Sequence, residues 1–182
     1  MRLIVFDMDG TLIDTHELIT EHMTATFSGA GLPVPAREAM RRVIGLSLPV
    51  AMARLAGSDE PALIDRLIAE YKGYYRATLE ANAHREPLFP GTRAALERLN
   101  GDDGTLLGVA TGKGLQGVER ILGKHGITTL FSTLQTPDHN PSKPHPGMLL
   151  SAMNETGAEP RETVMVGDTS FDMEMAVAAG VR

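Results

Sequence analysis

Acidic residues stand directly after two short apolar segments of this 182-residue chain. Asp7 and Asp9 follow the first segment, and Asp168 follows the last one, with Asp172 one helical turn further on. Two carboxylates about 4 Å apart repel each other by roughly 4 kcal/mol at an effective dielectric constant of 20. A cluster of these acids would therefore need a cation or a protonated member, and oxygen ligands of this kind favour Mg²⁺. For either motif alone, a solvated turn or a helix N-cap is the alternative.

Other residue types supply what an anionic ligand would need. Thr111 ends a third apolar segment, where its hydroxyl can donate to a phosphate oxygen. Gly112 lets the backbone approach closely, and the start of the next helix offers N–H groups. Lys143 stands in a proline-rich loop and could supply a fixed positive charge, unless it is a solvated loop lysine. Lys113 is the other candidate for this role, although the position of Lys113 directly after Gly112 favours a side chain that points into the following helix.

The apolar segments predict the strands that position these residues. Three segments are short and rich in Val, Ile and Leu: Leu3–Phe6, Leu106–Ala110 and Thr163–Val166. This composition is typical of strands buried on both faces of a parallel sheet. A weaker strand is predicted at Leu130–Thr133. Helical patterns follow the second and third segments, so we expect an α/β fold with a doubly wound, Rossmann-like parallel sheet, whose ligands bind beyond the carboxyl ends of the strands.

Residues 15–86 differ from the rest of the chain because they contain helical patterns and no convincing strand. We therefore predict an all-helical cap subdomain at 15–86. It would be inserted into a catalytic core formed by residues 1–14 and 87–182. Segments near Ile13–Thr15 and His84–Pro90 would act as hinges that let the cap close over the site and exclude water.

These residues together resemble the haloacid dehalogenase superfamily of phosphohydrolases. Its four motifs occur here in order: Asp7-Met8-Asp9-Gly10-Thr11, Thr111, Lys143 and Gly167–Asp172. The helical insert matches the subgroup that includes phosphoglycolate phosphatases and β-phosphoglucomutases. The resemblance runs from Arg2 to Arg182, where the family usually begins another core strand. The last strand of the core is therefore expected to be missing from this sequence.

The resemblance implies a Mg²⁺-dependent phosphatase that hydrolyses a small, phosphoglycolate-like phosphomonoester through an aspartyl phosphate. Asp7 would be the nucleophile. Asp9 would protonate the leaving oxygen and then activate the hydrolytic water. The Asp7 carboxylate, the Asp9 backbone carbonyl and Asp168 would hold Mg²⁺. Asp172 would support the site, either by orienting the lysine of the third motif or from behind the metal ligands.

The resemblance also implies a phosphate-binding set made of Thr111, Gly112 and Lys143. Lys143 counts among the catalytic residues, because phosphoryl transfer needs positioning and charge neutralisation more than covalent help. Gly112 departs from the family pattern, since many relatives carry asparagine there. One side-chain contact to phosphate would therefore be absent.

Two other functions stay open at this point. A β-phosphoglucomutase-like phosphotransferase would use basic cap residues, but the stretch Leu46–Met52 carries no charge. A non-enzymatic phospho-accepting or binding domain also combines acids, a threonine and a lysine on an α/β sheet. In such domains the acidic pair precedes an acceptor aspartate on a different strand, and a helical insert of this size is lacking.

The composition of the chain limits the classes of molecule that it is expected to bind. The net charge is −6, aromatic residues make up 4%, and tryptophan is absent, which disfavours nucleic-acid binding. No segment approaches the roughly 20 apolar residues that span a bilayer. The absence of cysteine fits a reducing compartment. We expect a cytoplasmic protein that binds a small phosphorylated metabolite and neither nucleic acid nor membrane, while the oligomeric state stays open.

Overall fold

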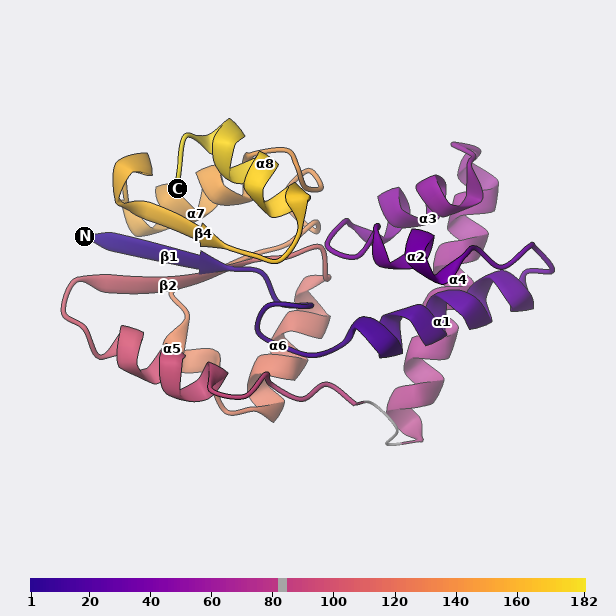
Figure 1. Ribbon diagram of the computed structural model, residues 1–182, viewed down its shortest axis with the longest axis horizontal. Coiled ribbons are helices and arrows are strands. Elements are labelled where there is room, and N and C mark those ends of the chain that lie inside the picture. Colours follow the sequence, from indigo (N-terminus) through magenta and orange to yellow (C-terminus); the bar gives the residue numbers. More distant parts are fainter. Residues whose placement is uncertain (82–84) are drawn as a thin grey trace. The chain divides into compact units, whose positions relative to one another are not determined.

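The computed structural model describes residues 1–81 and 85–182 and contains a parallel β-sheet. Within these residues the sheet has the strand order β3-β2-β1-β4. Its strands are β1 (Arg2–Phe6), β2 (Thr105–Ala110), β3 (Thr133–Gln135) and β4 (Thr163–Val166). The predicted α/β fold with a parallel sheet is confirmed (Figure 1). The weaker strand was predicted too early, because a 3₁₀ turn, η1 (Thr128–Leu130), occupies the start of that segment.

The strand register brings three strand ends to one edge of the sheet. Phe6, the last residue of β1, pairs with Val109 of β2 on one side and with Val166 of β4 on the other. The backbone N–H of Asp7 then donates to the carbonyl of Val166 at 2.9 Å. The segments that follow β1, β2 and β4 therefore start at the same edge, as ligand sites in parallel sheets require.

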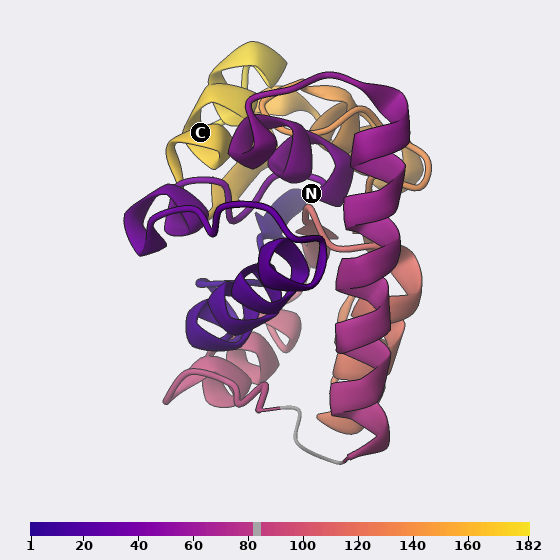
Figure 2. The same ribbon diagram turned by 90° about the vertical axis from the view of Figure 1, so that its right-hand side faces the viewer.

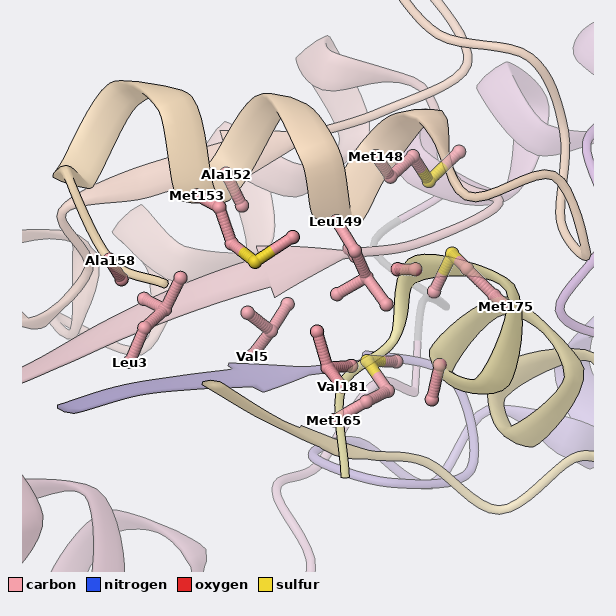
Figure 3. Packing of buried hydrophobic residues seen from close by; sticks show 13 residues of the cluster. Leu3, Val5, Met148, Leu149, Ala152, Met153, Ala158, Met165, Met175 and Val181 are labelled. Carbon is pink, nitrogen blue, oxygen red and sulfur yellow. The ribbon is translucent and has the colours of Figure 1, made fainter. Parts of the chain in front are cut away.

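Helices cover both faces of this sheet. They are α5 (Thr92–Asn100), α6 (Leu115–Lys124), α7 (Gly147–Thr156) and α8 (Ser170–Ala179), with a second 3₁₀ turn, η2 (Pro160–Glu162). Side chains alternate along β1, so that Leu3 and Val5 pack against α7 and α8 (Figure 3), whereas Phe6 belongs to the cluster on the opposite face. Burial on both faces explains why these strands are apolar throughout.

The remaining helices form a second compact unit. They are α1 (His16–Gly29), α2 (Arg37–Arg41), α3 (Leu48–Ala56) and α4 (Pro61–Glu80), and Figure 2 shows these helices in a second view. The unit comprises residues 15–44 and 48–87, whereas 1–14, 45–47 and 88–182 form the sheet-containing unit. The boundaries thus differ from the predicted ones at Gly45–Ser47, which belongs to the sheet-containing unit, and at Pro87, which belongs to the helical unit. Residues 82–84, including His84 of the predicted second hinge, lie outside the described residues.

The outer edge of β4 is paired by the final residue of the chain. The N–H of Arg182 donates to the carbonyl of Thr163 at 3.3 Å, and the N–H of Met165 donates to the carbonyl of Arg182 at 2.6 Å. These bonds lie on the edge of β4 that faces away from β1. Across residues 1–81 and 85–182, no helix is long and apolar enough to cross a membrane.

Candidate active site

Asp7 begins the tight turn after β1, and its side chain is fully buried. One carboxylate oxygen, Oδ1, accepts a hydrogen bond from the N–H of Met8 at 2.7 Å. Gly10 has φ of 88°, a conformation that glycine adopts without a steric cost. Its N–H donates to the carbonyl of Ile13 at 2.9 Å, which closes the turn. The turn fixes the backbone of both Asp7 and Asp9 at the carboxyl end of β1.

Lys143 connects two of the predicted acids. Its Nζ lies 2.6 Å from Oδ1 of Asp172 and 3.0 Å from Oδ2 of Asp7, and none of the three side chains is accessible to solvent. The contact with Asp7 has an ion-pair distance but lacks hydrogen-bond geometry. Removing one partner from a buried pair leaves an uncompensated charge, which is strongly destabilising. The alternative of a solvated loop lysine is wrong for Lys143.

Burial and neighbouring charges shift the pKa of these groups. Burial raises the pKa of Asp7 to about 6; the charge of Lys143 opposes this rise, and the charges of Asp172 and Asp9 add to it. Burial alone would lower the pKa of Lys143, but the charges of Asp7 and Asp172 outweigh it and raise that pKa above its usual range. Lys143 therefore keeps its positive charge at neutral pH, beside a carboxylate whose ionised form is costly.

Asp172 is held at the start of α8 by a capping box. Its Oδ2 accepts hydrogen bonds from the N–H of Thr169 at 3.0 Å and from the Thr169 hydroxyl at 2.7 Å. A Cβ at Gly167 would lie 2.4 Å from the same oxygen, so glycine is needed beside this carboxylate. Because Oδ1 contacts Lys143 and Oδ2 contacts Thr169, the geometry favours the first of the two predicted roles, in which Asp172 orients Lys143.

The acidic residues offer a set of donors suited to a divalent cation. Carboxylate oxygens of Asp7, Asp168 and Asp172 lie within 4.8 Å of one another. Asp168 is exposed, and its Oδ1 accepts a hydrogen bond from the Thr11 hydroxyl at 2.9 Å. A set made only of oxygen donors fits Mg²⁺. Asp7 and Asp168, the two side chains that the family resemblance implies as ligands, belong to this set and would hold the ion.

Thr111 and Lys113 stand at the end of β2. Thr111 is buried, and its N–H donates to the carbonyl of Gln135 in β3 at 3.1 Å. Lys113 Nζ lies 3.3 Å from Oδ2 of Asp9, and these two side chains are 14% and 9% exposed. The prediction that Lys113 points into the following helix is therefore wrong. The site thus contains two lysines, each beside a different acid of the first motif.

Gly112 lies against a segment that is distant in sequence. An ideal Cβ on Gly112 would lie 2.4 Å from the carbonyl oxygen of Leu46 and 2.5 Å from that of Gly45. The N–H of Ser47 donates to the Ser142 hydroxyl at 2.9 Å, which attaches the same segment to the loop that carries Lys143. The packing explains why an asparagine does not fit at position 112.

Three parts of the site were not predicted from the sequence. They are the hydroxyl of Thr11, the hydroxyl of Thr169 and the segment Gly45–Ser47. The spacing of Thr169 and Asp172 is that of a capping box and could have identified Thr169. No local pattern could have placed Gly45–Ser47, because its contact with Gly112 joins residues far apart in the chain.

The fold and the site together define a class of protein. The site combines a buried aspartate beside a lysine with further acids at the carboxyl ends of parallel strands. This arrangement is typical of an α/β enzyme in which a carboxylate reacts with an anionic group of the substrate. The family model of haloacid dehalogenase-like hydrolases matches residues 4–182. The chain belongs to this family.

Individual relatives agree with this assignment. The chain is 35% identical over 182 residues to the probable phosphatase IndB of Dickeya dadantii, covering 98% of this chain and 78% of that protein. It is 32% identical over 184 residues to a phosphoglycolate phosphatase of Pseudomonas putida, covering 100% of this chain and 67% of that one. A crystal structure of a haloacid dehalogenase-like hydrolase from Bacteroides fragilis matches with a TM-score of 0.87 at 26% identity, covering 99% and 84% of the two chains.

Proposed function

We propose that the protein is a Mg²⁺-dependent phosphatase that hydrolyses a small, phosphoglycolate-like phosphomonoester through an aspartyl phosphate on Asp7. The observation that carries this proposal is the buried Asp7 carboxylate, 3.0 Å from the ammonium of Lys143 at the carboxyl end of β1. The names of the relatives, a probable phosphatase and a phosphoglycolate phosphatase, support the reaction and the kind of substrate.

The binding of the phosphoryl group follows from the charges around Asp7. The Thr111 hydroxyl and the Lys143 ammonium would donate to the phosphoryl oxygens, and Gly112 completes the phosphate-binding set that the family resemblance implies. Asp7 and Asp168 would hold Mg²⁺, with the Asp9 backbone carbonyl as the further ligand that the family resemblance implies. The ion, when bound, supplies positive charge that offsets the carboxylates and the phosphoryl oxygens.

The reaction has two displacement steps at phosphorus. An Asp7 carboxylate oxygen attacks phosphorus, the bond from phosphorus to the leaving oxygen breaks, and Asp9 donates a proton to that oxygen. Asp9, now ionised, takes a proton from a water molecule whose oxygen attacks the phosphorus of the aspartyl phosphate. The bond from phosphorus to Asp7 breaks, which releases phosphate and restores the carboxylate.

The helical unit acts as a cap in this proposal. Residues 15–44 and 48–87 form a compact unit of their own, joined to the sheet-containing unit at the chain positions near 14, 45–47 and 88. A separate unit on such connections can move as one body and exclude water during phosphoryl transfer. The cap would admit small phosphorylated metabolites and restrict larger ones.

The test is turnover of 4-nitrophenyl phosphate and 2-phosphoglycolate by the purified chain. We expect phosphate release that requires Mg²⁺ and stops when EDTA removes it. Asp7→Asn should lower kcat by roughly a thousandfold or more, because it removes the nucleophile. Asp103→Asn, an exposed change of the same type, serves as the matched control and should retain full activity. A folded wild-type chain that hydrolyses neither ester in Mg²⁺ contradicts the proposal.

A further inference from the structure

The contact between Lys113 and Asp9 assigns a second lysine to the site. Lys113 Nζ lies 3.3 Å from Oδ2 of Asp9, whereas Lys143 lies beside Asp7 and Asp172. In the proposed reaction Asp7 forms the bond to phosphorus and Asp9 moves the protons. The two acids therefore have different roles in the reaction, and a different lysine lies beside each of them.

The backbone of Lys113 is held in place by its neighbours. It follows β2, which pairs with β1 so that Val109 lies opposite Phe6. The N–H of Lys113 donates to the Thr111 hydroxyl at 3.4 Å, and Gly112 between them is confined by the carbonyls of residues 45 and 46. The backbone of Lys113 is thus fixed in the segment that follows β2, and β2 is adjacent to β1, which the segment carrying Asp9 follows.

The Asp9 backbone is also fixed, but its side chain requires a further constraint. Asp9 forms an isolated bridge with Ile13, and Gly10 closes the turn between them. A fixed backbone still permits several side-chain rotamers. An ammonium 3.3 Å from Oδ2 favours the rotamer that places the carboxylate beside it. Because the two side chains are only 14% and 9% exposed, solvent ions screen this attraction less than at an open surface.

We infer that Lys113 is a positioning residue: its ammonium holds Oδ2 of the Asp9 carboxyl group, so that the protonated oxygen Oδ1 is placed to donate its proton to the leaving oxygen. The inference rests on the proposed function, since it takes Asp9 as the acid of the first step. A misplaced catalytic group loses rate steeply, by about a hundredfold for a displacement near 1 Å. Lys113 would therefore matter most for substrates whose leaving oxygen must be protonated as it departs.

Two substrates separate this role from a general structural one. Ethyl phosphate has an alkoxide leaving group that needs a proton, whereas 4-nitrophenolate departs without one. Lys113→Met removes the ammonium and keeps a chain of similar length. We expect it to lower kcat/KM about tenfold to a hundredfold for ethyl phosphate and less than threefold for 4-nitrophenyl phosphate. The parameter kcat/KM is chosen because it reports the steps up to phosphoryl transfer and excludes the later hydrolysis.

Two further variants complete the experiment. Lys113→Arg keeps a cation and should recover most of the activity on ethyl phosphate, and Lys124→Met, at the exposed end of α6, should match the wild type on both esters. Equal losses on the two esters, or no loss on either, would overturn the role of Lys113 while leaving the phosphatase in place. A wild-type enzyme inactive on both esters would instead contradict the proposed function, so the two failures are distinguishable.

Discussion

Six charged side chains make up the proposed site. Four are carboxylates and two are lysines, and the group comprises Asp7, Asp9, Lys113, Lys143, Asp168 and Asp172. The acids outnumber the lysines, so a divalent cation would bring the local charge to balance. Burial makes the balance important, because unpaired charge in a protein interior costs several kcal/mol.

A substitution at Gly112 tests how closely the segment Gly45–Ser47 packs against this residue. Gly112→Ala would place a Cβ within 2.4–2.5 Å of two backbone carbonyl oxygens, which cannot rotate away as a side chain could. We expect the free energy of unfolding to fall by about 1–3 kcal/mol, the usual cost of overpacking. Urea denaturation of the variant and the wild type measures the difference.

The control for this change is Gly123→Ala. Gly123 lies within α6, and a Cβ there would meet no atom within 4 Å. Alanine is favoured over glycine in helices by about 1 kcal/mol, so this variant should be as stable as the wild type or more stable. If Gly112→Ala unfolds at the same urea concentration as Gly123→Ala, the segment Gly45–Ser47 does not pack against Gly112 as described.

The sequence predicted which residues follow the strand ends, but it did not predict how their side chains are oriented. Asp7, Thr111 and Asp168 each follow a strand, and parallel pairing necessarily brings strand ends to one edge of the sheet. The direction of the Lys113 side chain could not be predicted, because it depends on the position of Asp9 in the turn that follows the neighbouring strand. Side-chain orientation at a strand end is a tertiary property and has no local signal.

At the scale of secondary-structure elements, the start of α8 contributes to the site directly. Thr169 caps the helix, and its hydroxyl also donates to Asp172, which in turn contacts Lys143. One element thus stabilises its own N-terminus and sets the position of a buried cation. A substitution at this helix N-cap should therefore affect both the free energy of unfolding and kcat.

Thr169→Val tests this coupling. The variant keeps the shape of the side chain and removes the hydroxyl, so we expect a loss of about 1 kcal/mol in the free energy of unfolding. The kcat should also fall, because one of the two hydrogen bonds between Thr169 and Oδ2 of Asp172 is lost. Thr169→Ser should preserve both properties. Thermal melting measures the stability, and steady-state kinetics measures kcat. A lower stability with unchanged kcat would mean that the N-cap of α8 does not orient Lys143.

The elements themselves were largely predictable. The strands β1, β2 and β4 were expected, because short Val/Ile/Leu segments suit a sheet buried on both faces, although β1 and β2 each begin one residue earlier than predicted. The strand β3 was misplaced, since Thr133–Gln135 has only three residues and little apolar character to mark it. Short edge strands of this kind form through pairing with their neighbour.

At the scale of the whole molecule, the chain divides into a sheet-containing unit and a helical unit. The division was predictable from the contrast between apolar strand segments and residues 15–86. The assignment of Gly45–Ser47 to the sheet-containing unit was not, because it depends on contacts with Gly112, Ser142 and Thr169.

The proposed cap predicts a dependence on substrate size. A unit that closes over the site should favour small phosphomonoesters, so kcat/KM for 2-phosphoglycolate should exceed that for a phosphoserine-containing protein by roughly a hundredfold or more. Phosphate release from both substrates under the same conditions gives the ratio. Efficient turnover of the phosphoprotein, with poor turnover of the small ester, would show that the helical unit does not restrict access.

The central claim is that Asp7 carries the phosphoryl group, and rapid acid quenching tests it most directly. The wild type and Asp9→Asn are mixed with 4-nitrophenyl phosphate labelled in its phosphate, quenched within one turnover, and digested to locate the bound label. Hydrolysis of the intermediate needs Asp9 whereas loss of nitrophenolate does not, so Asp9→Asn should accumulate nearly one equivalent of phosphate on the peptide containing Asp7, and Asp7→Asn should carry none. Release of nitrophenolate and phosphate together, with no phosphate bound to the protein at any time, would contradict the account.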